Sequence, residues 1–157
     1  SLANRVASAP RRQIWTPVFV EGWALYCEEM MGEQGYYSDP RTRLLQLKDY
    51  LWRCCRVVID VGLHAGGLST DEAARTLSEI GKLNPVAAAG EVKRYTRTPT
   101  QPLSYAVGKR EILRLREELQ GREGREFSLK HFHDRLLQYG AIPVGLIRER
   151  LLAPPQA

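Results

Sequence analysis

Apolar residues recur every three or four positions along most of this chain, which is the spacing of one face of an α-helix. Proline follows a good capping residue at Thr16-Pro17, Asp39-Pro40 and Asn84-Pro85, as it does at the start of many helices. No segment shows the two-residue alternation of a β-strand. The pattern predicts an all-α fold, an irregular bundle of about seven helices at residues 17–33, 40–65, 70–81, 85–97, 102–121, 128–139 and 143–152.

The longest predicted helix, over residues 40–65, carries a continuous apolar stripe. The stripe comprises Leu44, Leu47, Leu51, Cys54 or Cys55, Val58 and Val61, at steps of three and four residues. Such a stripe is typical of a helix face that packs on a core. We therefore expect this helix to be the central spine, with the stripe facing inward.

The predicted helix over residues 17–33 is apolar on nearly every side, yet it carries two acidic residues in its middle. Phe19, Trp23, Tyr26 and Met30 share one stripe at helical spacing, while Glu21, Leu25 and Glu28 share another. We expect this helix to be largely buried. A buried carboxylate must be paired, hydrogen-bonded, protonated or bound to a metal, because an unpaired buried charge strongly destabilises a fold. Glu21 and Glu28 therefore need partners.

The length and composition suit one domain. The 157 residues, 43% of them hydrophobic, can build one core, and we expect residues 1–14 and 153–157 to be frayed ends. No uncharged apolar run approaches the roughly 20 residues that span a bilayer, so no membrane-spanning segment is predicted. The net charge is +5, but basic and acidic residues are interleaved in the second half, as on solvated helix faces. We therefore predict no nucleic-acid partner.

The three cysteines, Cys27, Cys54 and Cys55, lack the spacing of a disulfide framework or of a CxxC metal site. Cys54 and Cys55 are neighbours within a predicted helix, where a disulfide between them would be strained. We expect free thiols, with a vicinal redox pair as the alternative. Unpaired thiols slightly favour the cytoplasm, and a secreted or periplasmic location stays open.

Two groups of residues could carry chemistry. Asp60 and His64 are four residues apart near the end of a predicted helix, so the carboxylate could orient the imidazole toward a substrate. The alternative is a histidine that complements the helix C-terminus. The second group comprises Arg94, Tyr95, Gln101 and Tyr105. These side chains could bind the polar backbone of a substrate or stabilise an oxyanion. Alternatively, the two tyrosines could be core residues.

A complete catalytic zinc site is not predicted within the chain. Such a site usually takes three protein ligands, two of which an HExxH helix can supply. The sequence contains no HExxH, no CxxC and three scattered histidines. It also lacks phosphate-binding glycine loops and the GxSxG elbow of serine hydrolases.

Several motifs, in order along the chain, resemble one bacterial family. Glu21-Gly22-Trp23-Ala24-Leu25-Tyr26, followed by Glu28, closely resembles the EGWALYxE signature of the family catalogued as domain of unknown function 885. The resemblance covers about residues 15 to 150. It continues through Asp39-Pro40, Arg53 to Asp60, Gly62-Leu63-His64, Glu91, Arg94-Tyr95, Pro99, Gln101, Leu103-Ser104-Tyr105, Gly108 and Phe132-His133-Asp134.

Members of this family look like mostly helical, zinc-dependent peptidases of the gluzincin kind, in which an upstream HExxPGH helix supplies two histidine ligands and the general base. The resemblance implies that Glu21 is the third zinc ligand and that Glu28 supports the site or has a structural role. It also implies catalytic roles for His64 and Tyr105, with Tyr105 as the donor to an oxyanion or substrate carbonyl. The residues implied to contact the substrate are Arg94, Tyr95, Gln101 and Arg110.

The HExxPGH helix is missing from this sequence, so the resemblance implies the C-terminal part of a larger metallopeptidase-like protein. Its partners would be the N-terminal portion that carries HExxPGH, zinc and a peptide substrate. We expect the chain alone to be inactive and to bind no zinc tightly. Thr100 and Pro102 replace the glycine and alanine that are usual in the PGQALSY stretch.

The alternative function is a non-catalytic helical module that forms homodimers through the exposed cleft.

Overall fold

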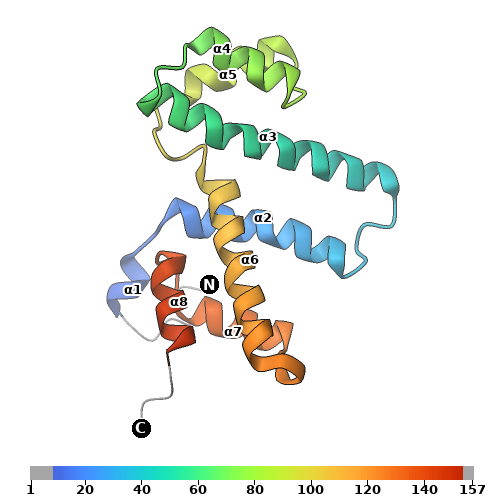
Figure 1. Cartoon of the computed structure of the whole chain (residues 1–157), viewed down its shortest axis with the longest axis vertical. Coiled ribbons are helices and arrows are strands. Elements are labelled where there is room, and N and C mark those ends of the chain that lie inside the picture. Colours follow the sequence, from blue (N-terminus) through green and yellow to red (C-terminus); the bar gives the residue numbers. More distant parts are fainter. Residues whose placement is uncertain (1–8, 154–157) are drawn as a thin grey trace.

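The computed structural model describes residues 9–153, and within them the fold is all-α, which confirms the predicted class. The seven predicted helices are all present, with ends within two residues of the prediction. A further short helix, α1, lies in the stretch that we expected to be frayed. The elements (Figure 1) are α1 (Ala9–Gln13), α2 (Pro17–Glu33), α3 (Pro40–Ala65), α4 (Thr70–Glu79), α5 (Pro85–Tyr95), α6 (Ser104–Glu123), the 3-10 turn η2 (Gly124–Glu126), α7 (Leu129–Gln138) and α8 (Val144–Leu152). Residues 1–8 and 154–157 lie outside the described part, so their fraying stays a prediction.

Two of the three predicted capping residues cap their helices. The side chains of Asp39 and Asn84 accept hydrogen bonds from backbone N–H groups two residues later, both at 2.9 Å. Ser69 and Glu72 form a complete capping box at the start of α4. Thr16 differs, because its hydroxyl donates to the carbonyl of Ala141 at 3.0 Å and so joins the start of α2 to the loop before α8.

The described residues form two hydrophobic cores. The first comprises Phe19, Tyr26, Ile112, Leu115, Leu119, Phe132, Leu136, Ile142, Val144 and Ile147, from α2, α6, α7, α8 and the loop before α8. The second comprises Cys55, Ile59, Ala73, Leu77, Ala88, Val92 and Tyr95, from α3, α4 and α5. Figure 1 shows α6 running from the α3 layer across α2 to α7 and α8, so this one helix connects the two cores.

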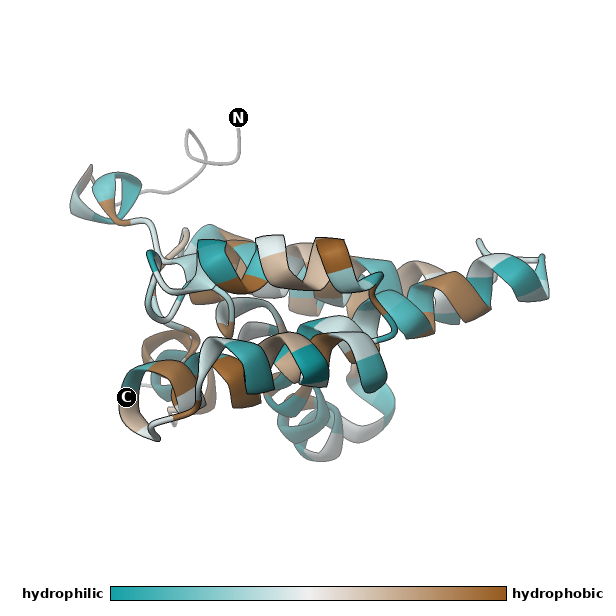
Figure 2. Cartoon of the chain, turned by 90° about the horizontal axis from the view of Figure 1, so that it is seen from above, coloured by the Kyte–Doolittle hydropathy of each residue, from teal (hydrophilic) through white to brown (hydrophobic). Residues whose placement is uncertain are grey.

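The apolar stripe of α3 does not face a core, which corrects the prediction. Its aliphatic residues are exposed: Leu44 by 68%, Leu47 by 45%, Leu51 by 39%, Val58 by 67% and Val61 by 52%. Of the two cysteines considered for the stripe, Cys54 is half-buried and Cys55 lies in the second core. The opposite face of α3, with Cys55 and Ile59, packs against α4 and α5 and forms the second core with them. In Figure 2 the N-terminal half of α3 extends past the other helices, with apolar and polar residues alternating along it.

The second helix is less buried than we predicted. Phe19, Gly22, Leu25 and Tyr26 are its buried residues, whereas Glu21 is half-buried. The helix therefore has one face in the first core and another that is partly open.

No helix among residues 9–153 is both long enough and apolar enough to cross a bilayer. The three cysteines are free thiols, as predicted. Burial raises the pKa of Cys27 and is the main cause that raises the pKa of Cys55, so both side chains behave as packed, protonated thiols.

Candidate active site

The backbones of α2 and α6 touch where two glycines meet. A Cβ atom built on Gly22 would lie 2.4 Å from the backbone of Gly108, and one built on Gly108 would lie 1.8 Å from the carbonyl oxygen of Val18. Only residues without side chains permit this approach. Glu21 precedes Gly22, and Tyr105 lies one helical turn before Gly108. The crossing therefore fixes the helix segments that carry these two predicted site residues against each other.

Glu21 lies on the side of α2 that faces away from α7. Side chains advance by about 100° per residue along a helix, and Trp23 and Tyr26 both point to α7. The Trp23 ring lies 5.3 Å from the His133 ring, and the Tyr26 hydroxyl lies 2.8 Å from His133 Nε2. Glu21 is therefore roughly opposite to this aromatic face, outside the first core.

The carboxylates of α2 differ in their partners. Glu29 Oε2 accepts from Lys109 Nζ at 2.8 Å, and this bond is the main cause that lowers the pKa of Glu29. Glu33 accepts from Arg116 at 2.7 Å. Glu21 and Glu28, by contrast, form no ion pair or side-chain hydrogen bond within residues 9–153. Both side chains are half-buried, and their carboxylate oxygen atoms are unpaired as far as the described part of the chain shows.

A buried polar cluster lies between α3 and α5. The Tyr95 hydroxyl accepts from Trp52 Nε1 at 3.1 Å and from Arg56 Nε at 3.0 Å, and it donates to Glu91 Oε2 at 2.8 Å. Burial is the main cause that raises the pKa of Tyr95. Burial alone would also raise the pKa of Glu91, but hydrogen bonds from Arg94 and Tyr95 outweigh it and leave that pKa lowered. Tyr95, predicted to contact substrate, is fully enclosed here, and all of its hydrogen-bonding capacity is used.

Tyr105 is held beside this cluster with its hydroxyl group available. The Arg56 guanidinium carbon lies 5.0 Å from the centre of the Tyr105 ring and 4.3 Å from that of Trp52, and Arg53 lies 6.0 Å from the Tyr105 ring. The Tyr105 hydroxyl has no hydrogen-bond partner within the described part of the chain. The ring is therefore oriented by cations, and the O–H group is free to donate.

Asp60 anchors the loop before α6 and also holds His64. Its side chain is buried, with Oδ1 accepting from Thr100 N and Oδ2 from Leu103 N, both at 3.2 Å. Oδ1 also lies 3.0 Å from His64 Nδ1, and the backbone carbonyl oxygen of Asp60 lies 2.9 Å from the same nitrogen. Asp60 thus fixes the imidazole, the loop and the start of α6, which carries Tyr105. The predicted Asp60–His64 pair is formed.

The remaining predicted substrate residues lie in two places. Arg94 binds Glu91 at 2.8 Å and reaches Gln101 Oε1 at 3.4 Å, so these side chains join the edge of the buried polar cluster. Arg110 lies elsewhere, on the side of α6 that borders the exposed stripe of α3. The structure therefore gathers Arg94, Tyr95, Gln101 and Tyr105 in one region and leaves Arg110 apart from them.

Two buried cations were missed by the sequence analysis. Arg56 lies under the polar cluster, and Lys109 has its Nζ 3.5 Å from the centre of the Tyr50 ring while it binds Glu29. Each basic residue occurs in a helix that is rich in arginine, where a cation usually indicates a solvated face. Arg56 and Lys109 are buried because side chains of adjacent helices cover them. The periodicity of a single helix does not show which residues those are.

The donors that this chain offers fit one ligand position of a zinc site and not a whole site. Within residues 9–153, no three histidine, cysteine, aspartate or glutamate side chains lie close enough together to hold a metal ion. The Glu21 carboxylate has no ion-pair or hydrogen-bond partner among the described residues, and it is a chemically suitable donor for Zn²⁺. Any further ligands would have to come from elsewhere.

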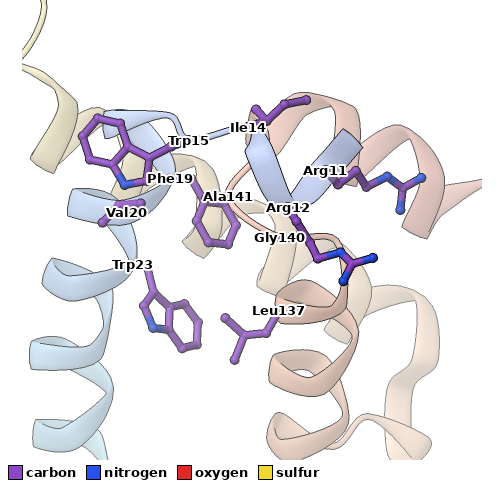
Figure 3. A pocket seen from close by; sticks show the side chains of 10 residues that line it. All are labelled: Arg11, Arg12, Ile14, Trp15, Phe19, Val20, Trp23, Leu137, Gly140 and Ala141. Carbon is purple, nitrogen blue, oxygen red and sulfur yellow. The ribbon is translucent and has the colours of Figure 1, made fainter. Parts of the chain in front are cut away.

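An apolar pocket of about 280 Å³ lies on the side of α2 that is opposite to Glu21. Figure 3 shows the side chains that line it. Trp23 is one of its walls, so the pocket belongs to the aromatic face and is separate from Glu21. Its lining residues are Arg11, Arg12, Ile14, Trp15, Phe19, Val20, Trp23, Leu137, Gly140 and Ala141.

The model of one protein family matches residues 1–151, and its description is "Bacterial protein of unknown function (DUF885)". The chain belongs to this family. Membership confirms the resemblance that the EGWALYxE motif indicated. A search of curated proteins gave no match.

The solved structures that are similar to this DUF885 chain include two putative lipoproteins. One is "a putative lipoprotein of unknown function from Shewanella oneidensis", 33% identical, with a TM-score of 0.89 over 97% of this chain and 28% of the other. The second is "the putative lipoprotein from Colwellia psychrerythraea", 36% identical, with a TM-score of 0.85 over 90% of this chain and 24% of the other. This chain therefore spans about a quarter of the length of each.

Proposed function

We propose that this chain is the helical part of a zinc-dependent peptidase that supplies one metal ligand, Glu21, and the donor to the substrate carbonyl, Tyr105. The remaining two ligands and the general base would come from an N-terminal portion with an HExxPGH helix. Alone, the chain would bind peptide or zinc only weakly.

The observation that carries the proposal is the state of the Glu21 carboxylate. It is half-buried at the Gly22–Gly108 crossing and has no partner within residues 9–153, while Glu29 and Glu33 of the same helix have cationic partners. A carboxylate without a counter-charge in such a position is stabilised by binding a cation. The free hydroxyl of Tyr105 on the crossing helix gives the second group that the reaction needs.

Zinc, when bound, would polarise the peptide carbonyl and lower the pKa of a water molecule. Tyr105 would donate a hydrogen bond to the carbonyl oxygen as negative charge develops on it. Arg56 would orient the Tyr105 ring, and Asp60 would hold the start of α6 in place through the backbone of Leu103. His64, held by Asp60, would face the substrate.

The test uses the longer polypeptide that joins this chain to its HExxPGH portion. Glu21→Gln keeps the size of the side chain and removes the charge, so zinc content should fall well below one ion per molecule and peptide hydrolysis should be lost. Glu79→Gln is the control, because Glu79 is an exposed helix residue of α4, far from α2. Circular dichroism should show the same helix content in both variants.

Full zinc content and undiminished hydrolysis in Glu21→Gln would remove Glu21 from this role. A second variant, Tyr105→Phe, should keep its zinc and lower kcat by about a hundredfold, the usual loss for one oxyanion donor. An unchanged kcat would reject Tyr105 as the donor.

The alternative, a self-associating helical module, is favoured by the exposed stripe of α3 rather than by the Glu21 region. Five large aliphatic side chains of one helix are exposed there, and large exposed apolar patches usually mark interaction sites. Light scattering of the purified chain tests it, since a monomer at micromolar concentration would exclude a stable homodimer.

A further inference from the structure

The exposed stripe of α3 has the spacing of a coiled-coil seam. Leu44, Leu47, Leu51, Cys54, Val58 and Val61 follow one another at steps of three, four, three, four and three residues. This alternation places every member on one seam, where a second helix can lie alongside. Except for Cys54, which is half-buried, all of them are exposed within the described structure. The stripe is therefore shaped for a helix that the described residues do not provide.

A groove runs beside the stripe, between α3 and α6. Its cavity has a volume of about 470 Å³, and Cys54 and Val58 belong to both the groove and the stripe. The groove is lined by Tyr50, Cys54, Val57, Val58, Ala106, Val107, Arg110, Leu113, Arg114 and Glu117. A helix on the stripe would thus contact α6 as well as α3.

The charges that border this surface are mostly positive and uncompensated. Lys48 flanks the seam on α3, while Arg110 and Arg114 lie across the groove on α6. Glu117 is the acidic residue of the groove lining, and the three cations outnumber it. None of these three cations forms an ion pair within residues 9–153. Asp49, the nearest acidic residue of α3, lies on the far side of the helix from the seam and pairs with Arg53 at 3.7 Å.

These charges argue against a second copy of the chain as the occupant. Two copies paired through their stripes would bring the same cations toward each other, and like charges beside a seam oppose association. A partner helix with carboxylates along its edges would pair with these cations instead. The length of the relatives offers a source, since about three quarters of each lies outside the part that this chain matches.

We propose that the α3 stripe and its groove bind an amphipathic helix with acidic edges, contributed by the portion of the DUF885 polypeptide that lies outside this chain. The proposal goes beyond the zinc site, because it concerns a face that Glu21 does not share. It also assigns Arg110 to an ion pair with that helix rather than to the substrate.

The test measures binding of two synthetic helical peptides of about 21 residues, or three heptads. Both have leucine at the seam positions; one has glutamate along its edges and the other lysine. Fluorescence anisotropy with the purified chain should show at least about tenfold tighter binding of the glutamate peptide at low salt, with the difference shrinking at high salt. Leu47→Glu should weaken binding of the glutamate peptide at least about tenfold. Val86→Glu, at an 82% exposed position of α5, should leave it unchanged.

Three results would overturn the proposal. The first is that neither peptide binds, and the second is that both bind equally. The third is a homodimer of the chain that Leu47→Glu converts to a monomer, which would assign the stripe to a second copy. Because no peptide carries a zinc ligand, each result is independent of the Glu21 experiment.

Discussion

Gly108→Ala should separate α2 from α6. The new Cβ atom would lie 1.8 Å from the carbonyl oxygen of Val18, whereas real Cβ atoms essentially never approach closer than 3.0 Å, so the helices must move apart by about 1.2 Å. The neighbouring atoms are backbone and cannot rotate away. A gap of 0.5–1 Å already removes roughly a quarter to a half of the dispersion energy of the atoms that line it.

The expected cost is at the upper end of the range for overpacked cores, about 3 kcal/mol or more. Such a loss is a large share of the stability of a domain of this size. Urea denaturation followed by circular dichroism gives the free energy of unfolding. The matched control is Gly121→Ala in the same helix, because a Cβ atom there meets nothing within 4 Å. Alanine should stabilise that position by up to about 1 kcal/mol.

Equal urea midpoints for Gly108→Ala and the wild-type chain would refute the close crossing of α2 and α6. The same result would weaken the functional proposal, because the crossing is what fixes the segments that carry Glu21 and Tyr105 against each other.

Three further changes test the buried polar cluster and its loop. Tyr95→Phe removes the hydroxyl that accepts from Arg56, so the free energy of unfolding in urea should fall by about 1–3 kcal/mol. Burial raises the pKa of Glu91, but its hydrogen bonds outweigh burial and leave the pKa below the ordinary 4.5. Its stabilising effect is therefore complete above pH 4.5 and is lost as the pH falls through the lowered pKa. Glu91→Gln should therefore flatten the decline of the urea midpoint as the pH falls below 4.5. Thr100→Gly relieves a left-handed backbone with φ of 70° and should raise the melting temperature, whereas Thr96→Gly, at φ of −59°, should lower it.

Controls for the first two changes come from exposed positions. Tyr36→Phe, at a ring that is 70% exposed, should leave the unfolding free energy within about 0.5 kcal/mol of wild type. Glu79→Gln should leave the decline with pH unaltered. If Tyr95→Phe behaves like Tyr36→Phe, or Glu91→Gln like Glu79→Gln, the cluster does not contribute to stability as its geometry indicates.

Local sequence signals predicted the helices well. Capping residues and the prolines after them act within one or two turns, so their effect can be recognised without the fold. The Asp60–His64 pair was also predictable, because a helix brings residues four apart together whatever surrounds them. The family motif located Glu21 in the same way, as a carboxylate at a fixed place in a helix.

Contacts between distant helices were decided by the tertiary structure alone. The stripe of α3 has the periodicity of a buried face, yet Leu44 and Val58 are exposed, because periodicity shows which residues share a face and not which face meets a core. Arg56 shows the converse. Its charge indicates a solvated face, yet it is buried because α5 and α6 bring Tyr95 and Tyr105 around it. The sequence by itself determined the all-α class, the helix ends and the motif; only the packing of helices far apart in the chain determined which charges are buried, which are paired and which apolar face is left uncovered.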